Sequence, residues 1–198
     1  MAASLERNNA VTLPPMKRRT EKIRAVFRFT IPVVKGRSGR FTWSILKSIK
    51  SFKEKINSKN IDRIGKAFHI IVDGSDNFKT RFLINDYCFK KKKVLISGAI
   101  SKFDGQVYTF NFLKKNSPCL KCFIPKMPPN PDIDNCEFDG VLGPLAGIIG
   151  SIQANEVVKE ILGIGNTLCG FILIVDALKL TFRKVKLNKR LGCICYEK

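Results

Sequence analysis

Residues 68–90 read FHIIVDGSDNFKTRFLINDYCFK, and this stretch decides the fold. It opens with a short continuous apolar run, Phe68–Asp73, of the kind found in a parallel strand that is covered on both faces. A polar turn over 74–77 follows, and we expect a helix from Phe78 to about Lys90. Because α/β proteins bind ligands where a strand passes into a helix, the stretch predicts an α/β fold with a ligand site at the turn.

The rest of the chain continues this alternation of strands and helices. We expect strands at 94–100, 106–112, 171–176 and 180–187. Between the two pairs, residues 142–162 form a helical pattern in which small residues recur every three or four positions, a spacing that permits close backbone approach. Such alternation predicts a sheet with helices on its faces.

The residues upstream of these strands and helices differ from them in charge and in periodicity. Residues 1–50 hold twelve basic and two acidic residues, and residues 1–43 show no sustained period. Apolar residues at steps of three and four then predict an amphipathic helix over 44–58. We therefore expect residues 1–50 to be a poorly ordered basic leader and residues 51–198 to form the folded domain.

Length and composition narrow the class of protein. With 198 residues, 44% hydrophobic and 26% charged, the chain has the composition of a globular domain rather than of a disordered segment. No stretch approaches the roughly 18 to 20 apolar residues of a membrane span, and no secretory signal is present, so we expect a cytoplasmic protein without a membrane partner. The net charge of +20 favours acidic or phosphate-bearing partners. Nucleic acid is a minor alternative among them, because the leader has no regularly interleaved aromatic residues.

Two pairs of cysteines indicate a metal site. Cys119 and Cys122 are separated by two residues, and Cys193 and Cys195 by one. Each pair can offer two thiolates to a tetrahedral zinc ion. Structural zinc sites usually have two or more residues between paired ligands, so ordinary free thiols remain the alternative. The seven cysteines, an odd number in a chain without an export signal, argue against a disulfide framework.

Titratable residues also flank the predicted turn. A carboxylate at Asp73 or Asp76 can hold a magnesium ion that bridges nucleotide phosphates. The alternative is that Asp76 caps the helix that starts at Phe78. The only histidine, His69, lies in the apolar run and is expected to be a core residue.

Five short motifs follow one another from residue 73 onward. They are DGSDNFKTRFLINDYC at 73–88, FDGQV at 103–107, PCLKC at 118–122, CEFDGVLGP at 136–144 and GIIGSIQA at 147–154. In order and spacing they resemble the MoeB/ThiF/HesA adenylyltransferases, relatives of the ubiquitin-activating enzymes, over about residues 51–198. The resemblance implies a Rossmann-like domain that binds ATP and joins AMP to the C-terminal glycine of a ubiquitin-like sulfur-carrier protein, with release of pyrophosphate. The pathways implied are sulfur transfer in molybdopterin (molybdenum cofactor) or thiamine biosynthesis.

The same resemblance implies roles for particular residues. Asp76 matches the family's magnesium-binding aspartate, and Asn77 matches the residue beside the nucleotide in Mg-ATP binding. Cys136 resembles the cysteine that in some members carries the activated carrier as a thioester or acyl disulfide. A homodimer is expected, because relatives are commonly dimers. Zinc is implied at four cysteines: Cys119, Cys122, Cys193 and Cys195, of which the second pair lacks one spacer residue.

The family's opening motif has no match in this sequence. Its G-x-G-G-x-G loop, ribose-binding acid and phosphate-neutralising Arg and Lys are missing, and the glycines Gly36 and Gly39 have neither the spacing nor the flanking strand and helix. The expected fold is therefore the C-terminal part of a Rossmann-like adenylation domain with a zinc-binding loop, its first nucleotide-binding βαβ unit missing. Two functions stay open: an adenylyltransferase that activates a sulfur carrier, or a non-catalytic remnant that serves as a zinc-stabilised interaction module.

Overall fold

The structure is a computed structural model. It describes residues 51–115, 117–128, 140–193 and 195 in full, and the backbone of two short strands, β1 (Val33–Lys35) and β2 (Phe41–Trp43), which pair antiparallel. Cys136 and most of the expected leader lie outside the described residues.

A five-stranded sheet forms the centre of the domain, in the order β3-β4-β5-β6-β7. The pair β3–β4 is parallel, and the other three pairs are antiparallel, so the sheet is mixed. The expected α/β class is confirmed, with strand bounds within two residues of those read from the sequence. The strands are β3 (Ile70–Asp73), β4 (Val94–Ser101), β5 (Asp104–Asn111), β6 (Phe171–Asp176) and β7 (Thr181–Lys186).

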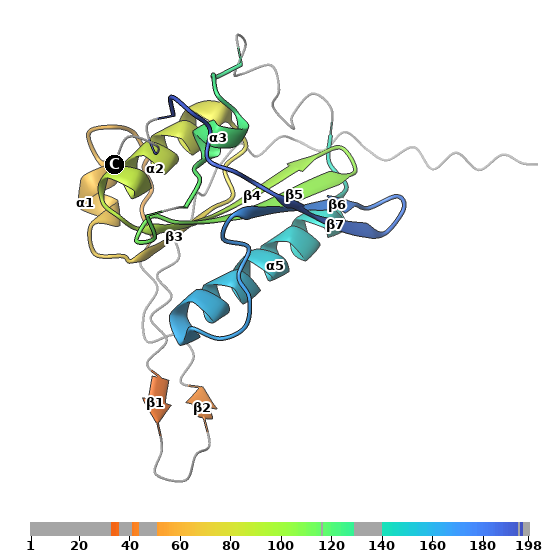
Figure 1. Ribbon diagram of the computed structural model, residues 1–198, viewed down its shortest axis with the longest axis horizontal. Helices are drawn as coiled ribbons and strands as arrows, with labels where there is room; N and C mark the ends of the chain where they lie inside the picture. The colour runs from red at the N-terminus through yellow and green to blue at the C-terminus, as the bar shows by residue number, and fades with distance from the viewer. Residues whose placement is uncertain are drawn as a thin grey trace, which may run out of the picture.

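Helices cover both faces of this sheet. Figure 1 shows α5 (Gly143–Leu162) along one face and α2 (Phe78–Lys90) with the short α3 (Leu120–Phe123) on the other. Alternate residues of β4 divide between the two layers, as the two-residue period of a strand requires. Val94 and Ile96 pack in the cluster beneath α5, and Leu95 packs in the cluster beneath α2.

The close approach of α5 to the sheet depends on glycines of the strands. A Cβ at Gly105 would lie 2.5 Å from Cδ1 of Ile149, and one at Gly98 would lie 2.6 Å from the side-chain amide of Gln153. At Gly147 and Gly150, which belong to α5 itself, an added Cβ would have no contact within 4 Å. The expectation that small residues of this helix permit the close approach is therefore wrong, because they lie on the side of α5 that faces away from the sheet.

The prediction of an amphipathic helix over 44–58 is also wrong for residues 51–58, the part of it that the structure describes. Residues 51–60 form coil and a turn, and the helix α1 covers only Ile61–Gly65. Two asparagine side chains explain the difference. Asn57 Oδ1 accepts from the backbone N–H of Lys59 at 2.9 Å, and Asn60 Oδ1 accepts from that of Asn57 at 2.8 Å. Local bonds of this kind compete with helical ones.

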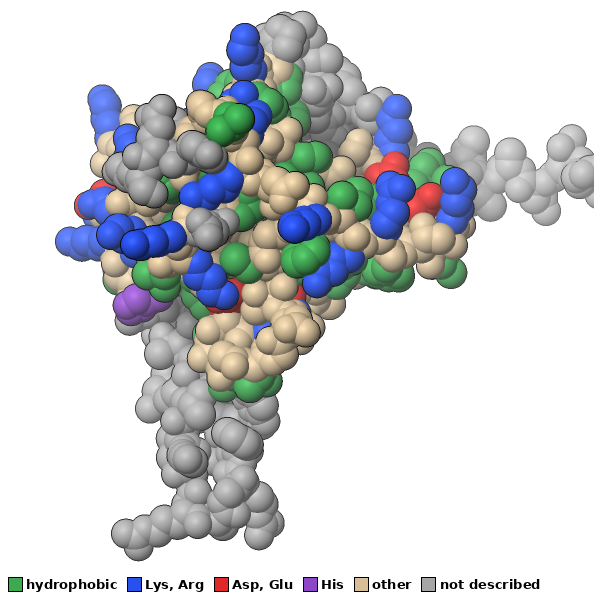
Figure 2. Space-filling view, viewed as in Figure 1, with side chains coloured by type: hydrophobic (Ala, Val, Ile, Leu, Met, Phe, Trp, Pro, Cys, Tyr) green, Lys and Arg blue, Asp and Glu red, His purple; other side chains and the backbone are tan. Residues whose placement is uncertain are grey.

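His69 does not lie in the core. It precedes the first residue of β3 and is exposed, and as the only histidine it is the purple side chain at the surface in Figure 2. Because β3 is the edge strand of the sheet, no described strand covers the residue from the outer side. In the part of the chain that the structure describes, no helix is long and apolar enough to cross a membrane.

Candidate metal centre and the adjoining turn

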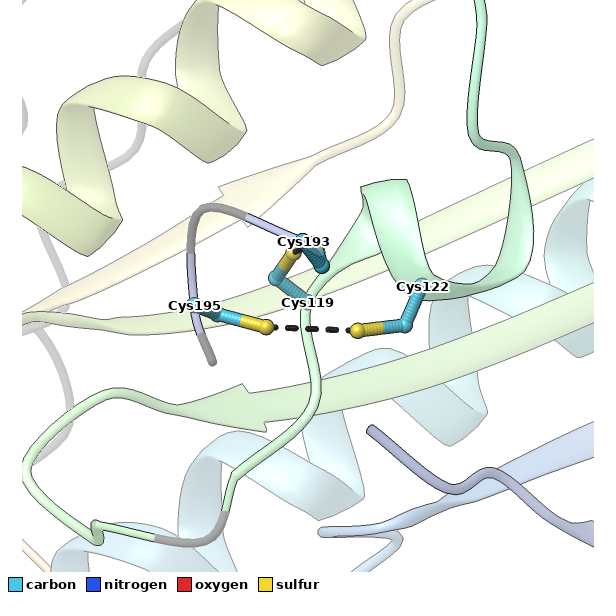
Figure 3. Close-up of side chains that lie close together, drawn as sticks. All are labelled: Cys119, Cys122, Cys193 and Cys195. Carbon is cyan, nitrogen blue, oxygen red and sulfur yellow. Dashed lines mark hydrogen bonds between the residues drawn. The ribbon is translucent and has the colours of Figure 1, made fainter. Parts of the chain in front are cut away.

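Four cysteines from distant segments meet beside α3. Cys119 is the residue before α3 and Cys122 lies within it, whereas Cys193 and Cys195 come from the C-terminal segment. Figure 3 shows the four side chains gathered at one point. The Sγ atoms of Cys119 and Cys193 are 3.5 Å apart, those of Cys122 and Cys195 are 3.2 Å apart, and all four lie within 4.8 Å of one another. This set is the cysteine cluster.

The cysteine cluster has the dimensions of a tetrahedral zinc site. Zinc binds thiolate sulfur at about 2.3 Å, which separates the four sulfurs of a tetrahedron by about 3.8 Å. The single residue between Cys193 and Cys195 does not prevent their sulfurs from meeting the other pair. The chemistry of the donor set and its spacing therefore fit zinc.

Burial sets the protonation of these thiols when no cation balances them. Desolvation, followed by the neighbouring sulfurs, raises the pKa of Cys119, and desolvation is also the main cause that raises the pKa of Cys195 to about 12. At Cys122 burial acts in the same direction, but hydrogen bonds from the backbone of Cys119 and Arg190 outweigh it and lower the pKa. A bound divalent cation would instead favour the thiolate form of these cysteines, because its positive charge outweighs the repulsion between the sulfurs.

Residues of α2 hold α3 in place for this cluster. Asn85 is fully buried, and its Oδ1 accepts from the backbone N–H of Leu120 at 3.0 Å. Lys121 and Asp86 form an ion pair of 2.8 Å. On the other side, Lys189 Nζ donates to the carbonyl of Cys195 at 2.9 Å. These contacts connect α3 to α2, and Lys189 to Cys195 within the C-terminal segment.

The two aspartates of the turn have different surroundings. Asp73 is 3% exposed, and its carboxylate accepts from the N–H of Ser75 and from the hydroxyl of Ser97, each at 2.9 Å. Asp76 is exposed, and its Oδ1 accepts from Asn77 Nδ2 at 3.0 Å. Asn77 caps α2, because its Oδ1 accepts from the N–H of Thr80 at 2.8 Å. The alternative that Asp76 is the helix cap is therefore wrong.

A cavity of about 270 Å³ lies between this turn and α3. Arg81 is the one cation among its lining residues, all of which belong to the described part of the chain. Burial raises the pKa of Tyr108 to about 12, so its hydroxyl is neutral near pH 7 and donates to Gln106. We call this space the Asp76 cavity. It is lined by Asp76, Phe78, Arg81, Ala99, Ile100, Ser101, Asp104, Gln106, Tyr108, Leu120 and Ile124.

Comparison with known proteins identifies the family. The model of the ThiF family matches residues 40–195. The chain belongs to the ThiF family. It is 38% identical to the sulfur carrier protein adenylyltransferase of Thermus thermophilus over 148 residues, which are 73% of this chain and 55% of that protein. It is 40% identical to the adenylyltransferase and sulfurtransferase MOCS3 of Drosophila virilis over 146 residues, 73% of this chain and 32% of that protein.

A solved structure shares the fold of this ThiF-family chain. A crystal structure of E. coli MccB with ATP superposes with a TM-score of 0.59 at 14% identity, and covers 74% of this chain and 45% of that one. The likeness confirms the expected fold, part of this family's α/β domain. The chain spans about half the length of the Thermus relative and about a third of the Drosophila one.

The ThiF-family chain places its expected site residues in two groups. The four cysteines come together, and Asp76 and Asn77 share the turn, while Cys136 lies outside the described residues. Leu120, which lies between Cys119 and Cys122 in the chain, also lines the Asp76 cavity, so the two groups are neighbours. Sequence reasoning missed Arg81 and Asn85 as site residues, although both lie in the motif at 73–88.

The described residues of the Asp76 cavity fit nucleotide phosphates less well than the cysteine cluster fits zinc. Asp76 offers the hard oxygen ligand that magnesium prefers. Within the described residues, however, no glycine-rich loop adjoins the Asp76 cavity, and Arg81 is its one cation. A triphosphate carries several negative charges, so the described residues do not form a complete ATP site.

Proposed function

We propose that this chain acts in the ATP-dependent activation of the C-terminal glycine of a ubiquitin-like sulfur-carrier protein. One observation carries the proposal: the Asp76 cavity lies between the turn that carries Asp76 and α3, the helix that carries Cys122 of the cysteine cluster. Two relatives that share 38% and 40% of their aligned residues with it are named as adenylyltransferases, one of them for a sulfur carrier. The pathway proposed is sulfur transfer for molybdenum cofactor or thiamine biosynthesis.

The cavity offers a narrow space for the end of an extended chain. Apolar walls at Phe78, Ile100 and Leu120 suit a tail of small residues, and the guanidinium of Arg81 suits its terminal carboxylate. Magnesium, when bound with a nucleotide, would neutralise phosphate charge, and we propose Asp76 as its ligand, with Asn77 beside it. Cys136 is proposed as the thiol that receives the activated carrier.

The cysteine cluster has a structural role in this proposal. Zinc bound by Cys119, Cys122, Cys193 and Cys195 would tie α3, which lines the cavity, to the C-terminal segment. Structural zinc sites have four protein ligands and no open position for substrate. The zinc would therefore stabilise one wall of the carrier site without contacting the carrier carboxylate.

Calorimetry with a ubiquitin-like sulfur carrier that ends in glycine tests the proposal. We expect the carrier to bind, and to lose binding when its last residues are removed. Ala99→Phe fills the cavity and should abolish binding, whereas Ala154→Phe, on the exposed side of α5, should not. A carrier that binds equally well to both variants would contradict the proposed site.

The second candidate function, a non-catalytic zinc-stabilised interaction module, is favoured by the incomplete phosphate site. It shares the carrier binding but not the nucleotide chemistry. Carrier-dependent exchange of pyrophosphate into ATP separates the two. We expect the isolated chain to give exchange near background, because positioning and charge stabilisation provide most of the catalysis of such transfers. Robust exchange that Asp76→Asn abolishes and Asp62→Asn, at an exposed residue outside the cavity, preserves would show a complete enzyme.

A further inference from the structure

A side-chain amide from α5 reaches the end of β3. Gln153 is 7% exposed, and its Nε2 donates to the carbonyl of Asp73 at 2.9 Å and to that of Ile96 at 3.3 Å. Asp73 is the last residue of β3, and the turn that carries Asp76 starts at the next position. The helix on one face of the sheet thus holds the chain where it leaves the sheet.

A glycine in the neighbouring strand makes room for this amide. A Cβ at Gly98 would lie 2.6 Å from both Cδ and Oε1 of Gln153, closer than real Cβ contacts come. Glycine inside a strand weakens that strand and often marks a close approach. Gly98 and Gln153 therefore act as a pair, in which one residue leaves the space that the other fills.

The opposite side of the turn is held from α2. Arg81 donates through Nη2 to the carbonyl of Ser75, and its Nη1 lies 3.5 Å from the hydroxyl of Ser97. Ser97 in turn donates to the carboxylate of Asp73, which also accepts from the N–H of Ser75. Gln153 fixes the backbone carbonyl of Asp73, and the Arg81 network fixes the carboxylate of Asp73 and the carbonyl of Ser75.

We propose that Gln153 is a positioning residue for Asp76. It does not line the Asp76 cavity, so it acts through the carbonyl of Asp73, whose direction sets the path of residues 74–77. With that carbonyl held, the turn presents Asp76 beside Arg81, the one cation among the lining residues described. The inference rests on the proposed function and adds a residue of α5 to its site.

Hydrogen exchange tests the positioning directly. Gln153→Met keeps the length of the side chain and removes the donor. Thr109→Val is the matched control, because Thr109 is fully buried and donates to Glu156 of the same helix at 2.8 Å, away from the turn. We expect Gln153→Met to speed amide exchange of residues 74–77 about tenfold, and Thr109→Val to leave it unchanged. Equal exchange in both variants overturns the proposal.

Carrier calorimetry on the same variants tests the consequence for the site. We expect Gln153→Met to weaken carrier binding about fivefold, while Thr109→Val lowers the melting temperature and leaves the affinity unchanged. A loss of affinity that follows the melting temperature in both variants assigns Gln153 a merely structural role and overturns the proposal. If the unaltered chain binds no carrier, the proposed function fails, and hydrogen exchange still decides whether Gln153 positions the turn.

Discussion

Sγ of Cys122 and Sγ of Cys195 lie 3.2 Å apart, although 73 positions separate the two residues in the chain. The contact joins α3 to the C-terminal segment (Figure 3). A bond or bridging ion between such distant positions restricts the unfolded chain, and the entropic benefit grows slowly with the length of the closed loop. A metal ion bound at the cysteine cluster would therefore stabilise the fold.

The first prediction is that the purified chain binds zinc at this cluster. Metal analysis should find about one zinc ion per chain, and Cys119→Ser with Cys122→Ser should remove it and lower the melting temperature, because metal binding is coupled to folding. Cys169→Ser is the control, since Cys169 is a partly buried thiol outside the cluster. Zinc retained in the double variant would contradict the assignment.

A buried carboxylate gives the second prediction. Glu156 is 2% exposed; its Oε2 accepts from Thr109 and from the N–H of Leu168, and Lys159 pairs with its other oxygen. Glu156→Ala should lower the free energy of unfolding by about 3 kcal/mol, because it leaves buried donors without a partner.

Chemical denaturation measures the effect of Glu156→Ala. The control is Glu54→Gln, which alters an exposed ion pair with Arg63 and should leave the stability almost unchanged. Similar losses in both variants would mean that the contacts of Glu156 contribute little.

The third prediction concerns the contact between Gly105 and Ile149. Gly105→Ala would place a methyl group 2.5 Å from Cδ1 of Ile149 and should destabilise the fold by about 1–3 kcal/mol through overpacking. In the background Ile149→Ala the same change should cost much less, because the space is then open. A double-mutant cycle with no coupling energy would show that β5 and α5 adjust without strain.

The fourth prediction is a loss of stability at alkaline pH. Burial raises the pKa of Cys88 to about 12, well above the ordinary value of the thiol. Above about pH 9 the unfolded chain therefore releases this proton while the folded chain keeps it, and stability falls by up to about 1.4 kcal/mol per pH unit. Cys88→Ala should reduce the slope of stability against pH between about 9 and 11.

Two tyrosines set the background for that measurement. Burial also raises the pKa of Tyr87 and of Tyr108 to about 12, so part of the alkaline slope should remain in Cys88→Ala. Denaturation by urea at a series of pH values measures the difference between the two proteins. Identical slopes would mean that Cys88 ionises equally in the folded and unfolded chains.

The elements next to clear turn signals were predictable from the sequence. The bounds 78–90 and 171–176 agree with α2 and β6, because a polar turn precedes the helix and the strand is a short continuous apolar run. The helix over 44–58 failed in its described part because Asn57 and Asn60 form local bonds that periodicity does not register. Antiparallel pairing beyond β4 was also not predicted, since it depends on the turns between strands.

The site was predictable where it depends on spacing within the chain. The two cysteine pairs predicted a four-cysteine metal site, because the short spacing within each pair can bring two sulfurs close together. The roles of Asn85 and Gln153 depend on partners 35 and 80 positions away, and neither residue has a local signature. Asn77 rather than Asp76 caps α2, a difference of one position that only the backbone conformation decides.

The sheet order has a consequence for handling the protein. The edge strand β7 carries Arg183, Lys184 and Lys186, charges that discourage pairing with a second copy. The other edge, β3, presents Ile70, Ile71 and Val72, with Val72 44% exposed, and none of the described strands pairs with its outer side. Added salt weakens repulsion between β7 edges but does not weaken attraction between β3 edges. If concentrated samples self-associate through β3, Val72→Lys should delay that aggregation more than a change of ionic strength does.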